Sequence, residues 1–95
     1  MTKHEEYYQR MIDENLDIFS QFMDLHDKYL LNPQTWQMKY NETGEKIMVI
    51  IRSWERRLCQ SSERGQYSKY SSVLADKFWN LVRKDFPKID FIGIR

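Results

Sequence analysis

The sequence predicts an all-α fold, a small helical bundle, on the basis of three observations. Three segments repeat their apolar residues with the 3.6-residue period of a helix. Prolines and glycines are few and fall between these segments, at Pro33, Gly44, Gly65, Pro87 and Gly93. The chain has 95 residues, 41% hydrophobic and 31% charged, which is the composition of an ordinary globular protein with one core. We therefore expect residues 1–95 to form a single helical domain.

The first expected element is one long helix over residues 4–31. Its apolar residues fill about half of the helical circumference, and its charged and polar residues fill the other half. The apolar half comprises Tyr8, Met11, Ile12, Leu16, Ile18, Phe19, Phe22, Met23, Leu25, Tyr29 and Leu30. This arc is wider than packing against one helix requires. We expect the helix to contact two neighbouring elements or to face a second subunit.

Residues 33–63 allow two interpretations. Asn32 and Pro33 form a typical helix start, which predicts a short helix over 33–40, and a further helix is expected over 44–63 with Gly65 as its stop. The alternative is an α+β domain with a β-hairpin at 36–51, because this stretch alternates and is rich in β-branched residues. We favour helix, because the apolar positions from residue 47 to residue 58 share one arc.

The last helix is expected over residues 68–86, with Pro87 ending it. The tail that follows is apolar and is predicted to dock against the bundle. The core residues expected from the centre of each apolar arc are Ile12, Leu16, Phe19, Met23, Leu30, Ile47, Ile51, Trp54, Leu58, Leu74, Phe78 and Leu81.

The residue types that usually perform catalysis or bind metals do not occur in this sequence at the spacings that these functions require. Three isolated glycines cannot build a phosphate-binding loop, and the two histidines, His4 and His26, lack a metal-ligand spacing. A lone cysteine, Cys59, excludes a disulfide within the chain and a cysteine-only metal site. We expect no catalytic residues, no metal ligands and no cofactor, and hence a protein that is not an enzyme.

Two polar residues fall on the apolar arc of the first segment. His26 lies at its centre and Asn15 lies close to the same line. A polar group on a core face must find a hydrogen-bond partner, because leaving it unpaired costs about 1–3 kcal/mol. We expect both side chains to be buried and hydrogen-bonded.

Two hypotheses for function remain. The first is a non-enzymatic protein–protein interaction or regulatory module, with a homodimer among its candidate assemblies. The alternative is nucleic-acid binding by the basic half of the chain: residues 43–95 hold eleven Lys or Arg against six Asp or Glu, whereas residues 1–42 hold four against eight. The basic and aromatic surface that would serve is formed by Arg52, Arg56, Arg57, Lys69, Trp79, Arg83 and Lys84.

The sequence also predicts a cytoplasmic location. The N-terminal residues lack the apolar stretch of a signal peptide. The longest uncharged apolar run is five residues, which is far too short to span a membrane.

Overall fold

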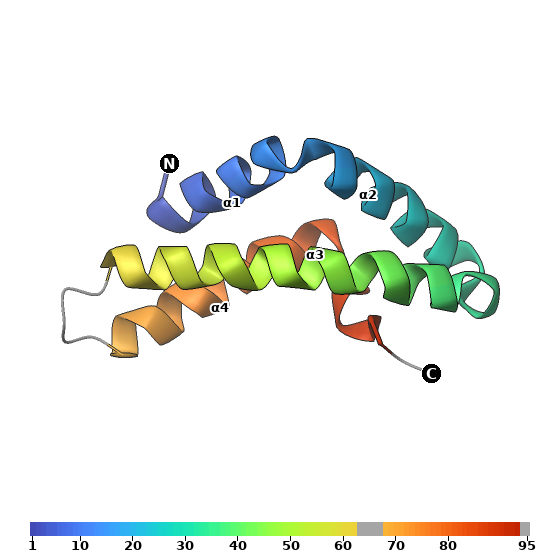
Figure 1. The fold of residues 1–95 in the computed structure, drawn as a ribbon. Coiled ribbons are helices and arrows are strands. Elements are labelled where there is room, and N and C mark those ends of the chain that lie inside the picture. The colour runs from blue at the N-terminus through green and yellow to red at the C-terminus, as the bar shows by residue number, and fades with distance from the viewer. Residues whose placement is uncertain (63–67, 94–95) are drawn as a thin grey trace.

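The computed structural model describes residues 1–62 and 68–93, and in this part of the chain the fold is all-α, as predicted (Figure 1). The described residues form four α-helices in an elongated bundle measuring 46 × 25 × 19 Å, in which α1 and α2 arch over α3. No strand occurs among the described residues, so the hairpin alternative for 36–51 is wrong.

The predicted helix over 4–31 is two helices, α1 (Lys3–Glu14) and α2 (Leu16–Leu31). The break falls at Asn15, whose backbone leaves the helical region with φ −129° and ψ 36°. The Asn15 side-chain amide donates a hydrogen bond to the Met11 carbonyl at 2.9 Å, and its backbone N–H bonds to the Ile12 carbonyl. Asparagine competes in this way for helix carbonyls, which ends α1 and bends the chain. Asn15 is therefore a half-buried hinge residue rather than a fully buried one.

The helices predicted over 33–40 and 44–63 are one thirty-residue helix, α3 (Pro33–Ser62). Asn32 caps its start, as predicted, by accepting a hydrogen bond from the Thr35 N–H at 3.2 Å. Gly44 does not interrupt the helix, and Gly65 lies outside the described residues. No helix in the described part of the chain is both long enough and apolar enough to cross a bilayer.

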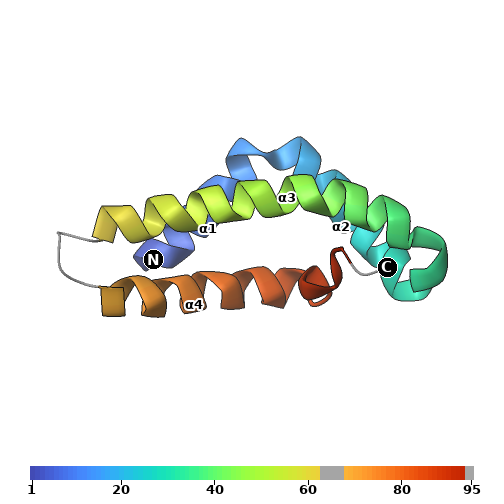
Figure 2. The ribbon, with the colours of Figure 1, turned by 60° about the horizontal axis from the view of Figure 1, so that its bottom comes forward.

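Helix α4 (Ser68–Asp85) runs alongside α3, and the segment after it turns back onto the first half of α3 (Figure 2). This segment contains a short 3-10 helix, η1 (Ile89–Phe91). Ile89 is 1% exposed, so the prediction of a docked tail is confirmed for the described residues.

The core lies between α3 and the other three helices, and half of the twelve predicted core residues are buried in it. Those six are Phe19, Ile47, Ile51, Trp54, Leu58 and Phe78, while Ile12, Leu74 and Leu81 are half-buried. The prediction is wrong for Leu16, Met23 and Leu30, which are exposed. The core residues that the prediction omitted are Tyr8, Met11, Phe22, Tyr29, Tyr40, Val82, Phe86 and Ile89.

Candidate interaction surface

Three aliphatic side chains of α2 form an exposed line, which we call the α2 stripe: Leu16, Met23 and Leu30. They are 57%, 37% and 48% exposed. Their spacing of seven residues places them on one side of the helix, next to the buried Phe19. Leaving this much apolar side chain in water is costly, so the α2 stripe is a candidate contact surface.

A groove of about 290 Å³ lies beside the first two residues of the α2 stripe, Leu16 and Met23. Leu16 and Met23 line it, together with the buried Phe19 and Phe86. At the α1 end, the Tyr8 hydroxyl donates a hydrogen bond to Asp85 at 2.6 Å, which ties α1 to the end of α4. Burial, together with this bond, raises the pKa of Tyr8 well above its usual value, so the phenol stays protonated and keeps donating. The groove therefore has fixed walls from three helices.

The hinge between α1 and α2 is acidic. A second hollow, of about 390 Å³, is lined there by Asp13, Glu14, Asn15, Leu16, Asp17 and Ile18. Leu16 borders both hollows, so the α2 stripe begins at this acidic hinge. Further along, Asp27 is exposed and lies one turn from both Met23 and Leu30.

His26 fixes the position of the chain just after α4. Its ring is 2% exposed, and Nε2 accepts a hydrogen bond from the Lys88 backbone N–H at 3.1 Å. The ring packs edge-on against Phe86 with centroids 5.8 Å apart. Burial lowers the pKa of His26 below its ordinary value, so the ring is neutral at pH 7 and Nε2 is free to accept. His26 thus holds the α4 wall of the groove in place.

A chain of side-chain hydrogen bonds continues from α2 through α3 to the docked tail. The Tyr29 hydroxyl donates to Gln37 at 2.6 Å, and the Gln37 amide donates to the Phe91 carbonyl at 3.2 Å. The Tyr40 hydroxyl donates to the Lys88 carbonyl at 2.6 Å. Tyr29 and Tyr40 stack with ring centroids 4.2 Å apart. This network explains why two tyrosines occupy the core, because each hydroxyl has a partner.

The residues predicted to form a basic and aromatic surface do not all come together. Arg52, Arg56 and Lys84 are exposed, and Lys69 lies in α4 with its side chain outside the described part of the structure. Arg57 lies over the ring of Trp54 at 4.6 Å. Arg10 of α1 contacts the same ring, so Arg57 belongs to the side of α3 that faces α1.

Trp79 and Arg83 are engaged within the chain. The Trp79 indole N–H donates to Glu55 at 2.5 Å, and its ring is half-buried. Arg83 donates to both carboxylate oxygens of Asp90, at 3.0 and 3.3 Å, and lies 5.5 Å from the Trp79 ring centroid. These bonds to Asp90 raise the pKa of Arg83. Trp79 and Arg83 therefore already have hydrogen-bond partners within the chain, and a nucleic acid would have to compete with these partners.

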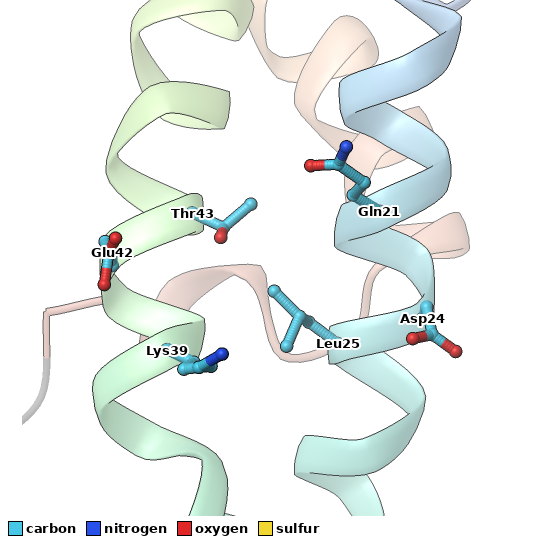
Figure 3. A pocket seen from close by; sticks show the side chains of 6 residues that line it. All are labelled: Gln21, Asp24, Leu25, Lys39, Glu42 and Thr43. Atoms are coloured by element: carbon cyan, nitrogen blue, oxygen red, sulfur yellow. The ribbon is translucent and has the colours of Figure 1, made fainter.

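A polar pocket of about 300 Å³ opens on the other side of α2, between α2 and α3 (Figure 3). Leu25 and Lys39 point into the gap between the helices, whereas Asp24 points away from it. Asp24 is paired with Lys28 at 3.0 Å instead. Within the described residues, no group of three His, Cys, Asp or Glu side chains is arranged to hold a metal ion.

Comparison with known proteins gives no relative from which a role could be carried over. No protein family, curated protein or solved structure matches this chain. The α2 stripe and the groove beside it are therefore the features of this chain that bear on its function.

Proposed function

We propose that this chain is a non-enzymatic protein–protein interaction module that binds its partner through the α2 stripe and the adjoining groove. The observation that carries the proposal is the exposure of Leu16, Met23 and Leu30 in one line, whereas Tyr29 and His26 of the same helix are buried. A buried histidine on the same helix as exposed aliphatic side chains is a departure from the usual burial pattern of globular proteins.

The geometry of the groove also supports this proposal. Its walls are tied together by the bond from Tyr8 to Asp85 and by the bond from Lys88 to His26. A binding surface that is already fixed loses little conformational entropy when the partner arrives. A few side chains near the centre of an interface usually carry most of the binding energy.

A paired affinity capture from cells of the native host tests the proposal. The baits are the wild-type chain, the double variant Leu16→Ser/Leu30→Ser, and the control Val49→Ser/Val73→Ser. The control removes two exposed valines, 69% and 50% exposed, that lie on α3 and α4. We expect at least one protein to be captured by the wild type and the control and to be lost, by about tenfold or more, with the stripe variant. Capture that is equal for all three baits would contradict the proposal.

A further inference from the structure

We infer that the partner segment is an amphipathic helix with basic flanks, which lies along the α2 stripe of this chain. This inference rests on the proposed function and adds the chemistry of the partner. It follows from the spacing of the stripe, from the charges beside it, and from what a second copy of the chain would bring to the same place.

The spacing of the stripe favours a helix as the occupant. Leu16, Met23 and Leu30 repeat every seven residues, which is the spacing of one heptad position. Phe19, between the first two, is 3% exposed and lines the groove rather than forming a second exposed row. The stripe is about 21 Å long at 1.5 Å per residue, or four turns of a partner helix. An amphipathic helix with apolar residues three and four apart fills a groove of this kind.

The charges beside the stripe are mostly negative. Residues 3–31 hold seven Asp or Glu against three Lys or Arg. Asp13, Glu14 and Asp17 line the hollow at the hinge, and Asp85 is the charged residue among those that line the groove. A partner with Lys or Arg beside its apolar face therefore meets complementary charge.

The nearby cations offset only part of this charge, because two of the seven acidic residues have a basic partner. Arg10 contacts Glu14 at 3.8 Å and lies over the Trp54 ring, and Lys28 is paired with Asp24. On the α4 side, the Lys88 ammonium lies 4.6 Å from the Phe91 ring centroid, away from the groove lining.

A second copy of this chain is a poorer occupant. A two-fold dimer through the stripe would place the acidic hinge and Asp27 of one copy against α2 of the other. The two surfaces carry the same sign of charge, and like charges across an interface oppose association. The homodimer is therefore an outcome that the experiment must be able to detect.

The experiment measures binding of two designed peptides to the full chain by fluorescence anisotropy. Both peptides have about 18 residues, enough to cover the stripe, with leucines at coiled-coil spacing. One carries lysines at the flanking positions, and the matched peptide carries glutamates there. We expect the lysine peptide to bind at least about tenfold more tightly than the glutamate peptide at low salt, and the difference to shrink at about 0.5 M salt.

Three double variants of the chain locate the site. Leu16→Ser/Met23→Ser should weaken binding of the lysine peptide about tenfold or more, while Val49→Ser/Val73→Ser should leave it unchanged. Asp17→Asn/Asp27→Asn should reduce the preference for lysine over glutamate without abolishing binding.

The inference is overturned if both peptides bind equally, if the glutamate peptide binds better, or if neither binds. It is also overturned if light scattering shows a doubled mass that falls to the monomer with Met23→Ser, because a second copy then occupies the stripe. Preference for a labelled oligonucleotide over the lysine peptide would overturn it as well. If neither peptide binds but host-cell capture still depends on Leu16 and Leu30, only the basic-helix class is wrong and the interaction module stands.

Discussion

Replacing Phe22 with alanine is expected to lower the free energy of unfolding by about 3–5 kcal/mol, because the change empties a large, fully buried site. Phe22 is 0% exposed, and its ring centroid lies 5.1 Å from that of Phe86 and 5.2 Å from that of Tyr40. It therefore joins α2 to α3 and to the end of α4. Urea denaturation followed by circular dichroism measures the change.

Leu16→Ala is the matched control, since Leu16 lies on the same helix and is 57% exposed. We expect it to change stability by no more than about 0.5 kcal/mol. Should Phe22→Ala fail to fold, Phe22→Leu keeps the comparison measurable, with an expected loss of about 1 kcal/mol. A larger loss for Leu16→Ala than for either Phe22 variant would mean that α2 buries the other half of its apolar arc.

The fold class, the capped start at Pro33 and the docking of the tail could be predicted from the periodicity and from the punctuation by proline and glycine. The side of the first segment that is buried could not. Its apolar arc is about 180° wide, with His26 near its centre and Leu16, Met23 and Leu30 in one half, and periodicity alone does not say which half is buried. The fold buries the other half, which includes Tyr29 and His26, because the docked tail and α3 supply hydrogen bonds to these polar groups.

The break between α1 and α2 at Asn15 could not be predicted from the hydrophobic pattern either. The buried positions Met11 and Phe19 keep the helical register across it, so periodicity alone shows no break. Only the side-chain bond from Asn15 to the Met11 carbonyl reveals why the helix ends there. The candidate site could not be predicted either, because the sequence places Leu16, Met23 and Leu30 in the core, whereas the structure exposes them.

Gly44→Ala is expected to change stability in opposite directions in two backgrounds. A Cβ at residue 44 would lie 2.6 to 2.9 Å from three side-chain atoms of Ile92, so the docked tail must shift. Overpacking of this kind costs about 1–3 kcal/mol, which outweighs the gain of about 1 kcal/mol from replacing glycine within a helix. We therefore expect a net loss of about 1 kcal/mol in the wild-type chain.

In the Ile92→Ala background the obstruction is removed, and Gly44→Ala should then stabilise the protein by about 1 kcal/mol. The double-mutant cycle, measured by urea denaturation, should give a coupling of about 2 kcal/mol. Equal stabilisation in both backgrounds would show that the tail does not pack on Gly44. The sequence alone cannot distinguish a glycine that makes room for a packed side chain, as Gly44 does for Ile92, from a glycine that forms a turn. A single glycine between periodic segments is typical of both.

Methyl NMR can show residue by residue whether a partner binds at the α2 stripe. The full chain, with labelled Leu, Met and Val methyl groups, is titrated with the lysine-flanked peptide. We predict that the signals of Leu16, Met23 and Leu30 shift together and saturate, while those of Met38 and Val49, which are 85% and 69% exposed on α3, stay in place. Shifts at Met38 and Val49 with none at Met23 would contradict the account.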